Sequence, residues 1–224
     1  MSRLATSLVE LSTKRTVPAV LQDALTLDDL FDAEALWAPA RVRLLQRLKR
    51  EEVPVALWPQ SLHWNWAKKA ASLEPDRLTA LGDARLFGIA IESEWQGVLW
   101  AETHGPKQQE HTARLGASKR PLVHVCFVEI APWNWDIPLE PPDTGKVQKR
   151  KYKGLGVQLM ECAVRWSMQL EFRGRVGLHA LPQAEAFYRN DCGMTDIGPD
   201  PEYRGLRYLE MTEDQAQSFL EGKP

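Results

Sequence analysis

Cysteine is scarce in this chain: only Cys126, Cys162 and Cys192 occur, and they are widely spaced. An odd number without close pairs argues against a disulfide framework and a thiolate metal site, and it is typical of a reducing compartment. No run approaches the roughly 18 apolar residues of a membrane-spanning helix. The first residues also lack the apolar segment of a signal peptide. We therefore predict a cytoplasmic protein with no membrane contact and no bound metal.

The chain also lacks an excess of charge of either sign. Its 28 lysines and arginines nearly balance 30 aspartates and glutamates, which leaves a formal net charge of -2. Such a chain has no global field to draw it onto nucleic acid, so no nucleic-acid partner is expected. Tryptophan, in contrast, is abundant, with 9 residues among 224. Its large apolar ring with one N–H suits a core or a pocket wall.

The pattern of apolar residues, caps and turn formers predicts a mixed α/β chain. In chain order the predicted elements are strand 6–13, helices 26–52 and 63–73, strands 84–93, 97–104 and 121–131, helix 154–172, strand 174–181, helix 182–190 and strand 206–212. Pro39 is expected to break the first helix into two pieces. The two strands between residues 84 and 104 are expected to form a hairpin that turns at "EWQ".

One long connection interrupts this order. Residues 132–148, "PWNWDIPLEPPDTGKVQ", hold four prolines and predict a loop insertion. The remainder predicts a single domain over residues 1–224, with a core at 84–211 and an N-terminal helical part at 26–73.

The stretch "RKYKGLGVQLMECAV", residues 150–164, joins a basic run to an apolar helix through two glycines. A Walker loop needs a Lys-Ser/Thr pair after the second glycine, and a dinucleotide fold needs a third glycine and a later acid. Neither is present. A pyrophosphate loop at a helix N-terminus, a basic patch for nucleic acid and a solvated basic loop remain open.

Three segments resemble, in order, the core of the GCN5-related N-acetyltransferase (GNAT) family. They are "VEIAPWN", "KYKGLGVQLMECAV" and "GRVGLHALPQAEAFYRNDCGM". The first corresponds to a strand, the second to an (Arg/Gln)-x-x-Gly-x-Gly/Ala loop with its helix, and the third to a strand and a helix with Phe-Tyr. The resemblance covers about residues 84 to 211. It implies a twisted mixed sheet flanked by helices, with the N-terminal helices beside an acceptor cleft, and acetyl-CoA as the acyl donor.

The resemblance also implies roles for individual residues. Lys151 stands in the Arg/Gln position, and the strand that ends at Ile130 would offer backbone groups to the pantetheine and acetyl carbonyl. Tyr188 would protonate the leaving thiolate, since the usual tyrosine pKa of about 10 is close to that of a thiol. The pyrophosphate would be held by backbone N–H groups of Lys153, Gly154, Leu155, Gly156 and Val157.

Three features depart from the family pattern. Leu181 stands where an Asn is frequent, seven residues before the Tyr. The segment from Tyr188 to Gly193 is one residue longer than usual, and the connection from Pro132 to Gly154 is far longer. The long connection indicates a lid or an acceptor wall near the thioester.

Two further residues are candidates for the chemistry. Glu129 is a candidate general base, directly or through water, or alternatively a salt-bridged carboxylate at the strand end. His179 is a candidate base or donor to the acetyl carbonyl, or alternatively makes a structural hydrogen bond at the strand–helix turn. His124, on the opposite strand face from Glu129, is expected to be a satisfied core histidine.

Two tryptophan-rich stretches are candidates for acceptor binding. In "HWNW", His63, Trp64 and Asn65 are expected to line the acceptor cleft, while at least one tryptophan of the stretch packs in the core. In "PWNWDIP", Trp133 and Trp135 either stack on a substrate or pin the long loop.

The predicted activity is acetyl transfer from acetyl-CoA to a primary amine. Because no Cys-His pairing suggests a covalent enzyme route, direct transfer in a ternary complex is the simpler hypothesis. A small aromatic or apolar acceptor is favoured over a protein or an aminoacyl-tRNA, and a homodimer is one expected assembly. A non-catalytic acyl-CoA-binding or regulatory module is the alternative, and nucleic-acid binding through residues 146–153 is a third class.

Overall fold

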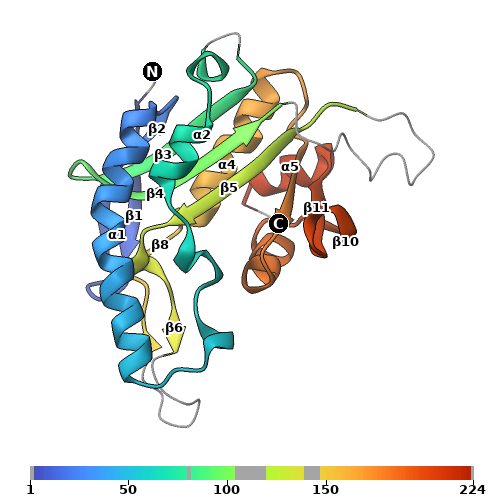
Figure 1. Cartoon of the computed structure of the whole chain (residues 1–224). Helices are drawn as coiled ribbons and strands as arrows, with labels where there is room; N and C mark the ends of the chain where they lie inside the picture. Colours follow the sequence, from blue (N-terminus) through green and yellow to red (C-terminus); the bar gives the residue numbers. More distant parts are fainter. Residues whose placement is uncertain (1–2, 80–81, 104–119, 139–146, 223–224) are drawn as a thin grey trace. The chain divides into compact units, whose positions relative to one another are not determined.

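The computed structural model describes residues 3–79, 82–103, 120–138 and 147–222 (Figure 1). Nine strands hydrogen-bond in the order β10-β11-β9-β5-β4-β3-β2-β1-β8. They are β1 (Arg3–Glu10), β2 (Arg15–Asp23), β3 (Ala84–Ile91), β4 (Glu94–Glu102), β5 (Val123–Ile130), β8 (Tyr152–Lys153), β9 (Val176–Ala180), β10 (Thr195–Asp200) and β11 (Leu206–Met211). Strands β5 and β9 run parallel, whereas β1–β2, β2–β3, β9–β11 and β10–β11 are antiparallel.

Helices flank this mixed sheet, so the predicted α/β fold class is confirmed. They are α1 (Leu27–Arg50), α2 (Trp66–Ser72), α4 (Leu155–Gln169) and α5 (Glu213–Leu220). Short 3₁₀ turns lie at Val55–Leu57, Gln60–His63, Pro75–Leu78, Pro132–Asn134, Pro182–Ala184 and Pro201–Tyr203, and a π-helical turn lies at Phe187–Asp191. Among the described helices, none is long and apolar enough to cross a membrane.

The chain divides into two compact units. The first comprises Met1–Asp76, Phe87–Val98 and Glu129–Gly156, and the second comprises Arg77–Leu86, Leu99–Val128 and Val157–Pro224. The backbone therefore crosses between the units several times, within strands β3, β4 and β5. The prediction of a single domain stays a prediction.

Helix α1 begins where the sequence predicts. The Thr26 hydroxyl accepts the Asp29 backbone N–H at 3.3 Å, and the Asp29 carboxylate accepts the Thr26 N–H at 2.7 Å. This reciprocal capping box satisfies two backbone donors that the first turn would otherwise leave open.

The expected break of α1 at Pro39 is wrong, because the helix runs through that residue without interruption (Figure 1). A proline inside a helix costs about 3 kcal/mol through a lost hydrogen bond and a steric clash. Burial of one face offsets this cost, since each fully buried large apolar side chain contributes about 1.5–3 kcal/mol. The fully buried side chains on this face are Leu30, Ala33, Trp37 and Leu48.

Several other predictions differ from the structure. The hairpin between β3 and β4 turns at Glu92 and Ser93, whose φ values of 49° and 73° match a type I′ turn. The predicted turn residues Trp95 and Gln96 instead lie buried in β4. Strands β2 and β10 were not predicted. Helix α2 begins only at Trp66, after Asn65 as its N-cap, so His63 and Trp64 precede it.

The described ends of the predicted loop 132–148 form a two-stranded hairpin. Strand β6 (Ile137–Pro138) pairs antiparallel with β7 (Val147–Gln148). Residues 139–146 lie outside the described residues. The hairpin is anchored in a core cluster of the first unit, formed by Leu44, Leu48, Val53, Trp135 and Ile137.

A substitution at Pro39 tests the account of α1. Pro39→Ala restores one backbone N–H to the helix, so we expect the free energy of unfolding to rise by about 1–3 kcal/mol. Urea denaturation measures this change. Pro75→Ala is the control, because Pro75 occupies a first-turn position where no helical hydrogen bond is restored. Equal effects of the two substitutions would contradict the account.

Candidate functional site

Glu129 lies at the end of β5 in the first unit and is only 4% exposed. The Trp66 indole N–H donates to its Oε2 at 2.6 Å, and Arg41 Nη1 lies 3.7 Å from the same oxygen. Arg41 also pairs with Glu34, whose carboxylate accepts the Trp66 backbone N–H at 2.8 Å. Trp66 thus donates to both carboxylates, and Arg41 lies between them.

The burial of this cluster shifts the titration of Glu129. Burial raises the pKa of Glu129 to about 7, while the charge of Arg41 and the hydrogen bond from Trp66 oppose the shift. The Ser61 side chain also favours the charged form of Glu129. The second carboxylate oxygen of Glu129, Oε1, has no hydrogen-bond partner among the described residues. A carboxylate with a pKa near neutral pH suits proton transfer at that pH. The buried contacts equally fit the salt-bridged alternative.

The pH dependence of stability tests this environment. Because the folded pKa of Glu129 lies above the unfolded value of about 4.3, the folded state binds the proton more tightly. The contribution of Glu129 to the free energy of unfolding therefore falls as the pH rises from about 4.5 to about 7, and it is constant above that pH. We expect wild type to lose up to about 3 kcal/mol relative to Glu129→Gln between pH 4 and 8. Chemical denaturation across this range measures the difference.

The control for that experiment is Glu74→Gln, at an exposed glutamate of the same unit. Its stability should run parallel to that of wild type at every pH. A constant difference between wild type and Glu129→Gln across the range would show that Glu129 does not titrate as described.

Sequence reasoning missed Glu34 and Arg41 as parts of this site. They lie seven residues apart on α1, on the same face as Trp37, Leu44 and Leu48, and both are buried. A charged pair within a buried apolar stripe is the signal that would have found them, because charged residues are rarely buried unless they are paired. Trp66 is fully buried, which confirms that one tryptophan of "HWNW" is core.

The predicted pyrophosphate residues form a strand–turn–helix unit. Strand β8 ends at Lys153, Gly154 follows with a φ of 98°, and α4 begins at Leu155. Glycine suits this backbone because other residues are strained there. The Leu155 side chain is 2% exposed and anchors the turn, while Lys151 and Lys153 are exposed. Gly156 and Val157 lie in the first helical turn, whose N–H groups have no partner within the helix.

The basic run before this turn is partly neutralised. Arg150 forms an ion pair with Asp136, with Nε and Oδ2 2.6 Å apart. The Lys151 ammonium lies 4.9 Å from the centre of the Tyr152 ring, and interaction with that side chain raises the pKa of Lys151. Of the Lys149, Arg150, Lys151 and Lys153 cluster, Arg150 is thus balanced by a carboxylate, whereas Lys151 stays charged.

The residues after β5 are tied to the rest of the first unit. Ile130 packs against the core cluster that contains Trp135. Trp135 is 9% exposed, which favours its role in pinning the loop over contact with a substrate. The Trp133 indole N–H donates to Gln96 Oε1 at 2.8 Å. Trp133 also borders an open cavity of about 260 Å³ together with Arg43, Arg47 and Gln148.

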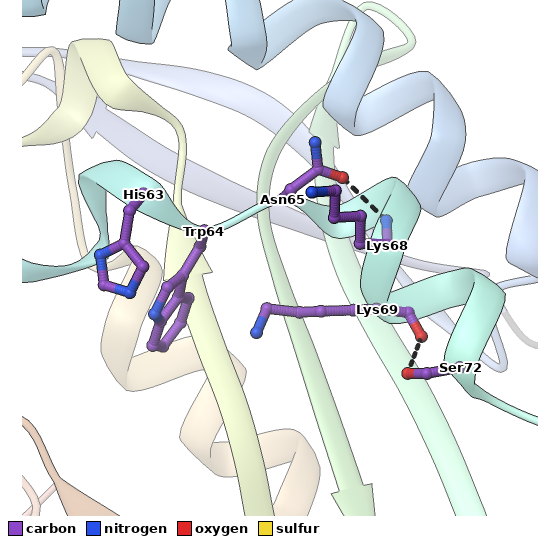
Figure 2. A pocket seen from close by; sticks show the side chains of 6 residues that line it. All are labelled: His63, Trp64, Asn65, Lys68, Lys69 and Ser72. Carbon is purple, nitrogen blue, oxygen red and sulfur yellow. Dashed lines mark hydrogen bonds between the residues drawn. The ribbon is translucent and has the colours of Figure 1, made fainter.

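The predicted acceptor residues His63, Trp64 and Asn65 share one open cavity of the first unit, with a volume of about 320 Å³ (Figure 2). Lys68, Lys69 and Ser72 complete its described lining. The Asn65 side chain also accepts the Lys68 backbone N–H at 2.8 Å as the cap of α2. We refer to this cavity as the His63–Ser72 pocket.

Tyr188 lies in the second unit and is 6% exposed. Its π-helical turn is closed by a bond from the Cys192 N–H to the Phe187 carbonyl at 3.1 Å. Such a turn accommodates one residue more than an α-helical turn, which explains the extra residue between Tyr188 and Gly193, and π turns occur frequently at functional sites. Burial raises the pKa of Tyr188, so its hydroxyl stays protonated and can act as a donor.

His179 is held in a structural network of the second unit. Its Nε2 lies 2.9 Å from Asp200 Oδ2, and the Tyr203 ring stacks on it at 3.6 Å between centroids. These contacts favour the structural alternative for His179. His124 is 4% exposed, and burial together with the nearby His179 lowers the pKa of His124 to about 4. It is therefore a neutral core residue, but the expectation that it is satisfied is wrong, because its buried Nδ1 has no hydrogen-bond partner among the described residues.

No protein-family model matches the chain, and no curated protein matches it. Among solved structures, the chain is similar to the GNAT domain of S. lividans PAT, with a TM-score of 0.50 and 14% identity over 93% of this chain and 96% of that chain. An acetyltransferase from Thermus thermophilus matches with a TM-score of 0.47 and 17% identity over 85% and 96% of the two chains. The PaiA N-acetyltransferase from Thermoplasma acidophilum, in complex with coenzyme A, matches with a TM-score of 0.45 and 11% identity over 86% and 98%.

The first of these similarities shows that the chain has the GNAT fold. The fold implied by the three sequence segments is therefore confirmed. The roles of the individual residues stay predictions.

Proposed function

We propose that the protein is an N-acetyltransferase that moves an acetyl group from acetyl-CoA to the primary amine of a small molecule. The observation that carries this proposal is the turn from β8 through Gly154 into α4, within a chain of the GNAT fold. A glycine with positive φ, open helical N–H groups and flanking lysines together form an anion-binding turn.

The chain's own residues fit a pyrophosphate at this turn. The N–H groups of residues 154–157 would donate to the phosphate oxygens, whereas Lys153 pairs with Val9 in the β1–β8 ladder; the exposed ammonium groups of Lys151 and Lys153 would balance the charge. The backbone of Ile130 would orient the pantetheine arm. Acetyl-CoA, when bound, supplies the thioester whose carbonyl carbon the amine attacks.

Direct transfer requires two proton movements. The amine nitrogen forms a bond to the carbonyl carbon, and the carbon–sulfur bond breaks. In this proposal Glu129 takes the proton of the amine, directly or through a water, because its pKa of about 7 lets it accept a proton near neutral pH. Tyr188 gives its proton to the departing thiolate. No covalent enzyme intermediate is needed.

Substitution of Gly154 tests the anion-binding turn. Gly154→Ala strains a backbone with a φ of 98° by about 1–2 kcal/mol and adds a methyl group to the turn. We expect the thermal stabilisation by coenzyme A to be lost. Gly205→Ala is the matched control, because Gly205 also has a positive φ, of 78°, but has open space around it. Its variant should lose similar stability and keep the full response to coenzyme A.

Removal of the Tyr188 hydroxyl tests its role as an acid. Phenylalanine preserves the buried ring, so Tyr188→Phe should fold and bind coenzyme A as wild type does. We expect kcat to fall about 10²- to 10⁴-fold, the usual contribution of general acid–base catalysis. Thiol release with acetyl-CoA and a panel of amines measures this rate. Unchanged turnover with intact coenzyme A binding would remove Tyr188 from the mechanism.

A non-catalytic acyl-CoA-binding module is a second candidate. It is favoured by the burial of Glu129 and by its contacts with Arg41 and Trp66, which also suit a purely structural carboxylate. Coenzyme A binding without thiol release for any amine in the panel would support this candidate over an enzyme.

A further inference from the structure

Helix α1 carries a second apolar stripe, on a different face from its buried residues. The members of this stripe recur at alternating spacings of four and three residues: Phe31, Ala35, Ala38, Val42 and Leu45. Phe31 and Val42 are 44% and 54% exposed, whereas Leu30, Trp37 and Leu48 on the core side are buried. We refer to the five residues as the outer stripe. Its spacing is the one along which two helices pack against each other.

The sizes of these side chains suit a helix that packs against a copy of itself. Phe31 and Leu45 lie seven residues before and seven residues after Ala38. If two α1 helices cross antiparallel at Ala38, Phe31 of each copy lies opposite Leu45 of the other. The large side chains then meet at the two ends, and the small alanines allow the helices to approach closely at the centre.

The charges beside the outer stripe favour the antiparallel direction. Asp32 and Arg43 are eleven residues apart, about three helical turns, so they project on the same flank. Both are exposed, and neither forms an ion pair with a described residue. In an antiparallel two-fold pair, equal flanks face each other, and Asp32 of each copy lies beside the partner's Arg43. In a parallel pair, this flank would instead meet the one that carries the buried Glu34 and Arg41.

We propose that the outer stripe is an interface between two copies of this chain, packed antiparallel through α1 about a two-fold axis at Ala38. The apolar side chains contribute most of the affinity, because exposed ion pairs contribute little. The Asp32–Arg43 pairs determine the direction of packing. Because the two-fold pair uses the same surface of both copies, assembly ends at the dimer. The inference does not depend on the proposed function.

Sedimentation velocity of the full chain over a range of concentrations measures the assembly. We expect a monomer–dimer equilibrium, and Phe31→Lys should raise its dissociation constant about tenfold or more, since it places a charge in an apolar contact. Val55→Lys is the matched control, because Val55 is an apolar residue of the same unit that is 72% exposed and lies outside α1. Its variant should dimerise as wild type does.

An exchange of charges tests the direction of packing. Asp32→Arg and Arg43→Asp each place like charges opposite one another at both ends of the interface, so each variant alone should dimerise more weakly than wild type. An equimolar mixture of the two variants should regain dimers, because both contacts of the heterodimer are then between opposite charges. The double variant should regain dimers by itself. Glu74→Arg, at an exposed glutamate outside α1, is the control and should behave as wild type.

Three results would overturn the inference. A chain that is monomeric at every concentration has no such interface. Dimers that Phe31→Lys leaves intact are held by another surface, and single charge variants that do not combine exclude the antiparallel arrangement. For a monomeric chain, thermal unfolding of Phe31→Lys identifies the other occupant. A loss of stability would indicate that another segment of the same chain covers the stripe, and unchanged stability would indicate a different protein.

Discussion

The burial of Arg41 between Glu34 and Glu129 is the constraint on which the first unit depends. Removing charges from water costs several kcal/mol each unless they are paired and hydrogen-bonded. Arg41 lies near both carboxylates, and Trp66 donates its backbone N–H to one and its indole N–H to the other. Helices α1 and α2 and the end of β5 therefore meet in an arrangement that pairs these buried charges, while Arg41 Nη1 and Glu129 Oε1 are left without a hydrogen bond to a described residue.

A second network extends this order from β4 to the glycine turn before α4. The Gln96 side chain accepts the Trp133 indole N–H, and the Gln96 carbonyl accepts the Ala131 N–H at 2.9 Å. The Asn134 side chain in turn accepts the Tyr152 N–H at 3.1 Å. The strand that leads into Gly154 is thereby held in register with the chain that follows Glu129. The start of the proline-rich segment therefore positions the strand that precedes Gly154.

Features that depend on neighbouring residues were predicted well. The start of α1, helix α4 and the glycine turn before it are local, since each is determined by residues within one or two helical turns. Predictions failed where distant packing overrode a local rule. Pro39 remains inside α1 because the flanking face is buried, and the β3–β4 turn falls at Glu92 and Ser93 because Trp95 and Gln96 are needed within the strand.

The sequence by itself determined the start of α1, helix α4 and the glycine turn between the basic run and that helix, because backbone preference and hydrophobic period are written in consecutive residues. Only the tertiary structure decided the chemistry of Glu129. Its pKa of about 7 arises from burial, opposed by Arg41 and Trp66, which lie far from it in the chain. Desolvation and pairing depend on what surrounds a group in space.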